Sequence, residues 1–255
     1  MAETFKKAAL ITSITKLTED IYSMWIKEED IVANAKPGQF LSLYCKSENR
    51  LLPRPISICE LDKDNGLLRL VYRVVGKGTE EFSKYKVSDR IEVMGPLGNG
   101  FHLEGKKAIL IGGGIGIPPM LELAKQLFCE KQIVLGYRDE TFLNEEFKPY
   151  GQVYLSTEDG SAGTKGNVID AIKANNIEGD IIFACGPTPM LRGVKAFALE
   201  NDIKAQISME ERMACGIGAC LACVCKSKEV DHHTHVNNKR ICKEGPVFYA
   251  EEVEL

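Results

Sequence analysis

The chain has 255 residues, of which 44% are hydrophobic and 27% charged, and its formal net charge at pH 7 is −4. This composition suits a globular protein of one large or two smaller domains, and the charge gives no indication of a nucleic-acid surface. No apolar run approaches the roughly 18 residues of a membrane-spanning helix, and the N-terminal MAETFKKAAL lacks the apolar stretch of a signal peptide. We therefore expect a cytoplasmic protein.

The first hundred residues are predicted to be mainly β-structure. Short alternating or β-branched runs occupy 39–46 (QFLSLYCK), 54–61 (RPISICEL) and 67–76 (LLRLVYRVVG), and the turn signals KDNG and GPLGNG follow two of them. Several short strands with turns between them predict an antiparallel barrel. One helix is expected in this part, over TEEFSKY (79–85), with Thr79 as its N-cap.

From about residue 106 strands and helices alternate, which predicts a doubly wound parallel sheet. The expected strands are 107–114, 132–139, 153–159, 180–187 and 204–210, and the expected helices are 118–128, 144–150, 167–175 and 188–201. Neither rhythm continues after about residue 209. The sequence thus predicts a barrel domain (1–101), an α/β domain (102–208) and a small cysteine-bearing segment (209–255). That segment is too short for a core of its own, so a metal centre is expected to stabilise it.

Two glycine-bearing turns follow predicted strands of the α/β domain. The first, GGGIGIPPM (112–120), opens a helix, where free N–H groups and small side chains suit a phosphate. It does not follow the usual G-x-G-x-x-G spacing, so an ordinary tight turn is the alternative. The second is ACGPTPM (184–190). Because ligands of parallel sheets bind beyond the carboxyl ends of the strands, the two turns together predict a nucleotide site at Gly112, Gly113, Gly114, Gly116, Cys185, Gly186 and Pro187.

The barrel carries two weaker motifs. In RPIS, the Arg54 guanidinium is suited to a phosphate and the Ser57 hydroxyl to the edge of a flavin ring, although most strand arginines are simply solvated. The second motif, VYRVVGKGT (71–79), ends in a Gly-Lys-Gly-Thr turn before the predicted helix. That turn is another candidate anion site.

Nine cysteines are present, an odd number that argues against a disulfide framework in a reducing compartment. Cys45, Cys59, Cys129 and Cys185 are scattered among apolar neighbours, as small buried side chains would be. The remaining five lie near the C-terminus, four of them in ACGIGACLACVCK (214–226).

The spacing of this cysteine group is C-x4-C-x2-C over Cys215, Cys220 and Cys223, and Cys242 follows after eighteen further residues. This is the spacing of plant-type two-iron clusters. Structural zinc, which favours two short-spaced pairs, is the alternative. Cys225 is interpreted as a packing residue. The histidines of DHHTH (His232, His233 and His235) are interpreted as a solvated loop, although such tracts can bind metals.

A barrel with RPIS and GKGT, followed by GGGIGIPPM and CGPTPM, resembles the ferredoxin–NADP reductase superfamily over residues 1 to about 209. With MEERMACGIGACLACVC and the late Cys242, the whole chain resembles the electron-transfer subunits of two-subunit, NAD-dependent dihydroorotate dehydrogenases. The resemblance implies FAD on the barrel, NAD on the α/β domain, a 2Fe-2S cluster at the C-terminus, and an FMN-bearing catalytic partner in a heterotetramer of two of each chain. Carried over by position, it implies FAD contacts at Arg54, Pro55, Ile56, Ser57, Val71, Tyr72, Arg73, Gly78 and Thr79, and iron ligation by Cys215, Cys220, Cys223 and Cys242.

A flavin exchanges electrons both in pairs and singly, so it is expected between the nicotinamide and the cluster. No side chain of this chain is expected to act on dihydroorotate, whose base belongs to the partner. Two other functions stay open on the sequence alone. One is a flavin and iron–sulfur reductase subunit for another acceptor, such as a ferredoxin, an electron-bifurcating partner or a hydrogenase. The other is a zinc-stabilised interaction module without a redox role.

Overall fold

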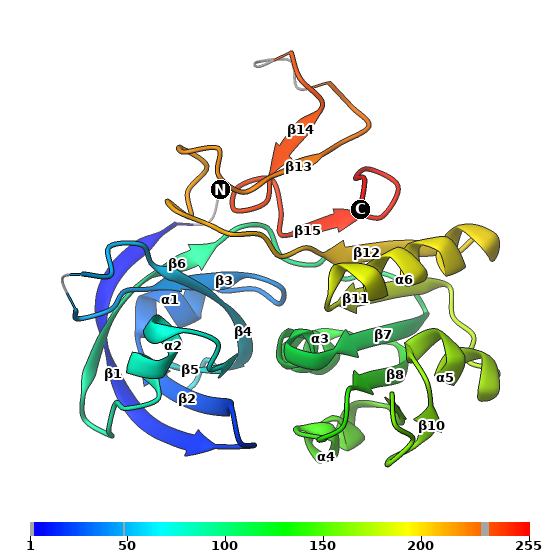
Figure 1. The fold of residues 1–255 in the computed structure, drawn as a ribbon, viewed down its shortest axis with the longest axis horizontal. Coiled ribbons are helices and arrows are strands. Elements are labelled where there is room, and N and C mark those ends of the chain that lie inside the picture. Colours follow the sequence, from blue (N-terminus) through cyan, green and yellow to red (C-terminus); the bar gives the residue numbers. More distant parts are fainter. Residues whose placement is uncertain (1–2, 48, 231–234) are drawn as a thin grey trace.

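Six antiparallel strands form a closed barrel in the first part of the chain, in the order β1-β2-β5-β4-β3-β6. The computed structural model describes residues 3–47, 49–230 and 235–255. The barrel strands are β1 (Phe5–Lys16), β2 (Ile21–Lys27), β3 (Phe40–Leu43), β4 (Arg54–Asp62), β5 (Leu67–Arg73) and β6 (Arg90–Leu97). The antiparallel barrel predicted from the strand and turn signals is therefore confirmed, and it fills one side of the molecule in Figure 1.

Two helices accompany the barrel, where one was expected. Helix α1 (Glu29–Asn34) was missed because it is short, and the Glu28 side chain caps it by accepting a hydrogen bond from the Ile31 N–H at 2.8 Å. Helix α2 (Lys77–Phe82) begins before the predicted start, with Gly76 as its N-cap. The assignment of Thr79 as N-cap is wrong. Its hydroxyl lies inside the first turn and accepts from the N–H groups of Val75 and Gly76, at 3.0 and 3.3 Å.

The second part of the chain forms a seven-stranded sheet in the order β10-β9-β8-β7-β11-β12-β15. Its strands are β7 (Lys107–Gly113), β8 (Glu130–Tyr137), β9 (Gln152–Thr157), β10 (Thr164–Lys165), β11 (Ile181–Cys185), β12 (Lys204–Ser208) and β15 (Val247–Tyr249). The neighbours from β10 to β12 are parallel, and β15 is antiparallel to β12. Because the order reverses between β7 and β11, the predicted doubly wound sheet is confirmed.

Helices cover both faces of this sheet. They are α3 (Pro118–Gln126), α4 (Asn144–Phe147), α5 (Val168–Ala174) and α6 (Thr188–Glu200), with the short 3-10 turns η1 (Gly114–Gly116) and η2 (Lys148–Tyr150). Alternate side chains of β7 serve the two faces: Ile109 and Ile111 share a buried cluster with residues of α5 and α6, whereas Ala108 and Leu110 pack with α3. None of the helices in the described ranges is long and apolar enough to cross a membrane.

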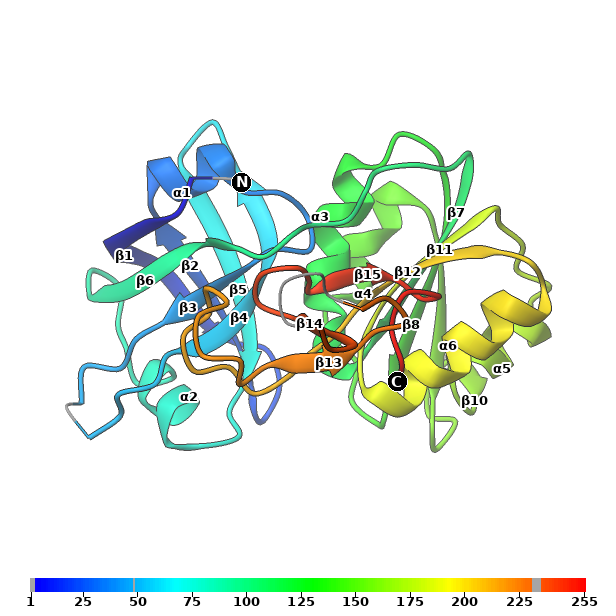
Figure 2. The ribbon, with the colours of Figure 1, turned by 90° about the horizontal axis from the view of Figure 1, so that it is seen from above.

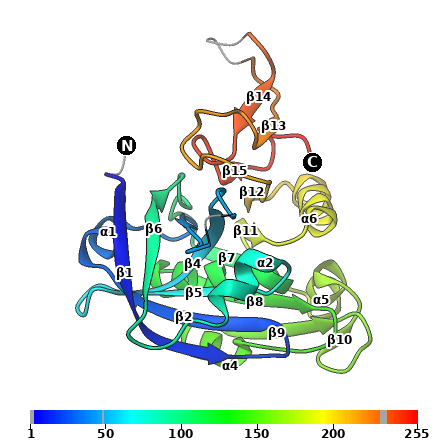
Figure 3. The same cartoon turned by 60° about the vertical axis from the view of Figure 1, so that its left-hand side comes forward.

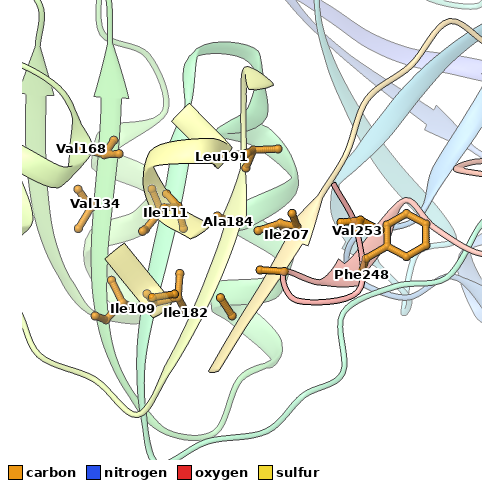
Figure 4. Close-up of a cluster of buried hydrophobic side chains, with 14 of the residues drawn as sticks. Ile109, Ile111, Val134, Val168, Ile182, Ala184, Leu191, Ile207, Phe248 and Val253 are labelled. Carbon is orange, nitrogen blue, oxygen red and sulfur yellow. The ribbon is translucent and has the colours of Figure 1, made fainter. Parts of the chain in front are cut away.

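The C-terminal segment rests on both domains, as Figures 2 and 3 show. It contains the hairpin of β13 (Val224–Lys226) and β14 (Asn238–Arg240) and then adds β15 to the edge of the sheet. Phe248 and Val253 lie beside Ile207 of β12 in the common core (Figure 4). The expectation that a metal centre alone would stabilise this segment is thus incomplete, because its second half packs into the α/β domain. A strand of only three residues, such as β15, has little signature in the sequence.

Asn99, which follows β6, joins the barrel to the same segment. Its backbone N–H donates to the Gly245 carbonyl at 2.6 Å, and its side-chain amide donates to the Glu244 carbonyl at 2.9 Å. The next carbonyl, that of Pro246, accepts from the N–H of Met209, directly after strand β12, at 2.9 Å. The stretch 244–246, shortly after Cys242, is therefore fixed between the two domains.

A second junction connects barrel strand β4 directly with helix α3. The carboxylate of Glu122, which is 3% exposed, accepts a hydrogen bond from the Leu61 N–H at 2.7 Å. Lys125, one turn further along the helix, pairs with Glu60 at 2.9 Å. Burial raises the pKa of Glu122, while hydrogen bonds from Gln126 and the Leu61 N–H oppose that rise. This carboxylate is the buried acceptor that fixes the helix on the barrel.

Replacing Glu122 by alanine is expected to lower the free energy of unfolding by about 1–3 kcal/mol, because the buried Leu61 N–H would lose its acceptor. Glu122→Gln keeps a carbonyl oxygen at this place and should lose less. Glu200→Ala, on an exposed end of α6, serves as the control. Urea denaturation of the three variants measures the effect, and equal losses for the two alanine variants would contradict it.

Candidate functional site

The two glycine turns of the α/β domain lie against each other at the point where the strand order reverses. Gly112 and Cys185 are register partners at the ends of β7 and β11. A Cβ atom on Gly116 would lie 2.3 Å from the Cys185 carbonyl oxygen, and one on Gly113 would lie 2.3 Å from the Met190 sulfur. Glycine is therefore needed at Gly116, where the obstacle is backbone, whereas at Gly113 the flexible Met190 side chain would have to move.

One side of this pair of turns is open. Gly114 has φ +52°, a left-handed conformation, and no heavy atom of the described neighbours lies within 4 Å of where its Cβ would be. Helix α3 starts just beyond it with two prolines, which have no N–H group, so the free N–H donors predicted at this helix start are absent from its first two positions. The open glycine turn itself lets a backbone approach the pyrophosphate of a dinucleotide closely. Burial raises the pKa of Cys185 to about 12, although a hydrogen bond with Ser208 lowers it in part. This thiol is therefore neutral.

The barrel motifs RPIS and GKGT also meet. A Cβ on Gly78 would lie 2.3 Å from the Arg54 Nε, so the guanidinium lies over the start of α2. Arg54, Pro55, Ile56 and Ser57 are all half-buried, whereas most of the rest of β4 is covered. A cavity of about 470 Å³ lies beside them, lined by Ser47, Asn49, Arg50, Leu51, Leu52, Arg54 and Lys77. Its cationic side chains fit an anionic ligand.

The other residues implied for the flavin point in different directions. Val71 is buried between the barrel and α3, while Arg73 is exposed and pairs with Asp20 at 3.0 Å. Tyr72 is 1% exposed, lies inside the barrel and stacks on Tyr22, so burial raises the pKa of its hydroxyl. The side chains of Val71 and Tyr72 are thus buried, and the Thr79 hydroxyl is bound within the start of helix α2. A ligand would therefore meet mainly the backbone at these three residues. Arg50 and Lys77, which line the cavity, were missed, although Lys77 lies inside the GKGT motif.

The four cysteines of the predicted cluster come together as two pairs. Cys215 contacts Cys220, and Cys223 contacts Cys242. Backbone N–H groups point at their sulfurs: Gly218 donates to Cys242 at 3.1 Å, Ala219 to Cys215 at 3.3 Å and Cys242 to Cys223 at 3.4 Å. Gly218 can do so because its φ of +81° is left-handed, as is the +71° of Gly216. The loop is therefore shaped to place donors around anionic sulfur.

The electrostatics of the two pairs differ. Partial burial raises the pKa of Cys215, but the N–H groups of Ile217, Cys220 and Ala219 outweigh it and lower this pKa to about 6. Burial, and then the Cys223 thiol beside it, raises the pKa of Cys242 to about 12. A bound metal favours the thiolate form of every ligand and so offsets the cost of deprotonating the buried Cys242.

The two pairs of thiols are close to each other, because Cys215 as well as Cys223 raises the pKa of Cys242. Among the described residues, no three His, Cys, Asp or Glu side chains gather closely enough to hold a single ion. A two-iron cluster needs four cysteines, two for each iron, and the donor set fits that need. The buried Cys225 instead contacts the Lys239 carbonyl at 3.5 Å, in keeping with a packing role. His235 is exposed, and His232 and His233 lie outside the described residues.

Comparisons with known proteins identify two of the domains. Residues 210–254 match the iron–sulfur cluster binding domain of dihydroorotate dehydrogenase B, and residues 8–102 match the oxidoreductase FAD-binding domain. The chain is 32% identical, with a TM-score of 0.87, to a chain in a structure of the electron-bifurcating NADH-dependent reduced ferredoxin-NADP oxidoreductase, covering 97% of this chain and 90% of that one. Ferredoxin reductase of carbazole 1,9a-dioxygenase, 21% identical with a TM-score of 0.67 over 78% of this chain and 67% of that one, shares the fold.

Three curated relatives bear the same name, dihydroorotate dehydrogenase B (NAD(+)), electron transfer subunit. The protein of Caldanaerobacter subterraneus subsp. tengcongensis is 41% identical over 98% of both chains. That of Fusobacterium nucleatum is 43% identical over 94% of this chain and 95% of its own, and that of Listeria monocytogenes is 44% identical over 94% and 96%. The chain therefore belongs to the family of electron transfer subunits of NAD-dependent dihydroorotate dehydrogenase B.

Proposed function

We propose that this chain passes electrons between an FMN-bearing catalytic partner and NAD, through a 2Fe-2S cluster and FAD, in an assembly of two copies of each chain. The chain is an oxidoreductase subunit with an FAD-binding domain and an iron–sulfur domain, and dihydroorotate is oxidised in the partner chain. The pairing of the four cysteine thiols beside the barrel is the observation that best supports this route. In this proposal the one-electron site would lie next to the flavin-binding strands.

The positions of the three sites support this order of transfer. A flavin exchanges electron pairs with nicotinamide and single electrons with an iron–sulfur cluster, so its site must adjoin both. Helix α3 packs on β4, whose first residues are the proposed flavin contacts, and α3 begins at the proposed NAD turn. The loop that carries Cys215, Cys220 and Cys223, here called the cysteine loop, lies on the neighbouring strand β3. A Cβ on Gly216 of this loop would be 2.8 Å from the Ser42 hydroxyl. The barrel strands therefore lie between the other two sites.

Each proposed site uses this chain's residues for a different task. Arg54, with Lys77 and Arg50 around the same cavity, would hold the phosphates of FAD, and Ser57 would face its ring. The open glycine turn at Gly114 would receive the NAD pyrophosphate, while Cys185, Gly186 and Pro187 would flank the nicotinamide. Cys215 with Cys220 and Cys223 with Cys242 would hold the two irons. These tasks suit the proposed division into residues 1–101, 102–208 and 209–255.

A second candidate function has one observation in its favour. The similarity to a chain of the bifurcating NADH-dependent reduced ferredoxin-NADP oxidoreductase extends over 97% of this chain. The same three sites would serve a partner that reduces ferredoxin, so the identity of the partner separates the two functions.

Affinity purification of the tagged chain from its own cells is expected to yield a second chain that contains FMN. The complex should reduce NAD⁺ with dihydroorotate, whereas the chain alone should not. Flavin analysis and absorbance at 340 nm measure the two properties. A partner that reduces ferredoxin and leaves dihydroorotate unchanged would favour the second function, and a flavin-free, zinc-containing chain would contradict both.

Alanine at Cys215, Cys220, Cys223 or Cys242 is expected to abolish the electron paramagnetic resonance signal of the reduced cluster, because each substitution deprives one iron of a ligand. Turnover of dihydroorotate should vanish with it, while NADH should still reduce the FAD, which precedes the cluster on that path. Cys225→Ala is the matched control and should keep both the signal and the turnover. A normal signal without Cys242, or a lost signal without Cys225, would overturn the ligand assignment.

Arg54→Ala is expected to weaken FAD binding, because a phosphate would lose a charged hydrogen-bond partner worth about 1.5–3 kcal/mol. This corresponds to an affinity roughly 10- to 100-fold lower. The exposed Arg90, which donates to the Ala8 carbonyl at 2.9 Å, provides the control as Arg90→Ala. Flavin content after dialysis measures the effect, and equal retention in the two variants would reject the role of Arg54.

A further inference from the structure

Ser42, in the middle of β3, is a buried hydroxyl without a partner. It is 1% exposed, and its Oγ has no hydrogen-bond partner anywhere in the described part of the chain. A serine hydroxyl can donate one hydrogen bond and accept two, and native structures rarely leave such a group buried and unsatisfied. The position therefore indicates a ligand or cofactor atom that completes it.

The alternation of β3 shows which way Ser42 points. Leu41 and Leu43 belong to the core inside the barrel, so Ser42, between them, points outward. Outward residues of a barrel are normally solvated, but Ser42 is covered. A Cβ on Gly216 would lie only 2.8 Å from its Oγ, so the cysteine loop covers it.

The other side chains around this contact are apolar. A Cβ on Gly216 would also lie 3.3 Å from the end of Leu97 and 3.8 Å from the end of Met94. Phe40, two residues before Ser42 on the same face of the strand, packs in one cluster with Cys223 and Cys242. Ser42 thus supplies a hydroxyl to the otherwise apolar surface on which the cysteine loop packs.

Strand pairing places this hydroxyl beside the proposed flavin contacts. Ser42 is the register partner of Pro55, and Phe40 is the partner of Ser57. Directly paired residues of antiparallel strands have Cβ atoms about 5 Å apart and on the same face. Ser42 therefore lies between the flavin-binding strand and the loop that follows Cys215.

We propose that the Ser42 hydroxyl donates a hydrogen bond to the thiolate sulfur of Cys215 in the iron-loaded protein and thereby raises the reduction potential of the cluster. This inference rests on the proposed function. The Ser42 hydroxyl is an unpaired donor that lies against Gly216, and Gly216 directly follows Cys215. It would add a side-chain donor to a sulfur that backbone N–H groups, such as that of Ala219 at 3.3 Å, already approach. Hydrogen bonds to sulfur stabilise the more negative, reduced cluster, which is how proteins tune such potentials.

The test compares Ser42→Ala and Ser42→Thr with Ser156→Ala in the purified complex. Ser156 is a fitting control because its hydroxyl is equally buried and also lacks a partner within the described residues, but it lies in β9 of the α/β domain. Redox titration followed by electron paramagnetic resonance gives the cluster potential. Resonance Raman spectroscopy gives the stretching frequencies of the iron–cysteine bonds.

Ser42→Ala should lower the cluster potential by an amount that shifts the one-electron equilibrium with the flavin about tenfold, or roughly 59 mV. It should also shift an iron–cysteine stretch, while Ser42→Thr restores both values and Ser156→Ala changes neither. An unchanged potential, a shift confined to the bridging sulfides, or a shift of the flavin potential alone would overturn the role of Ser42. A wild-type complex without any two-iron signal would instead overturn the proposed function itself.

Discussion

The hydrogen bonds around Gly245 and Pro246 are the constraint on which the arrangement of the three sites depends. Asn99 of the barrel and Met209, directly after the last strand of the α/β domain, both bind this short stretch of the C-terminal segment. Strand β15 begins at the next residue, and Cys242 lies just before the stretch. The cysteine loop is consequently fixed to both domains mainly by backbone hydrogen bonds, which depend little on side-chain chemistry.

The junction of β4 with α3 provides a second fixed point, on the opposite side of the flavin-binding strands. Glu122 binds the backbone of β4, while its own helix begins at the open glycine turn. One rigid helix and one rigid strand thus set the distance between the proposed sites for NAD and FAD. Transfer between two bound groups needs close and reproducible approach, and the buried hydrogen bond of Glu122 holds the helix on the strand.

Sequence predicted those features that local chemistry determines. The strand runs, the glycine turns and the cysteine spacing each depend on neighbouring residues, so the barrel, the doubly wound sheet and the C-terminal iron–sulfur domain followed from them. Features that depend on distant contacts were missed. Strand β15 exists because β12 offers a free edge, and the three residues of β15 carry no strong signal of their own. Thr79 is a residue type that often caps helices, but the N-cap of α2 is Gly76.

The side chains of the candidate site likewise depend on distant contacts that the sequence does not show. The meeting of Arg54 with Gly78 was not foreseeable, since it needs β4 and α2 to be placed by the closed barrel. The inward direction of Tyr72 also depends on the register of β5 with β2, where it faces Tyr22. Ser42 has no signal in the sequence, because its burial comes from a loop that lies far away along the chain.

The place of β15 at the edge of the sheet also bears on how the protein behaves when it is shortened. An uncovered edge strand offers unpaired N–H and C=O groups to other molecules, which is a common route to aggregation. Here β15 covers β12, and Phe248 and Val253 cover the apolar side chains beside it. Truncation before residue 247 would keep all the cysteines but remove β15, and the exposed edge of β12 is then expected to promote self-association of the protein.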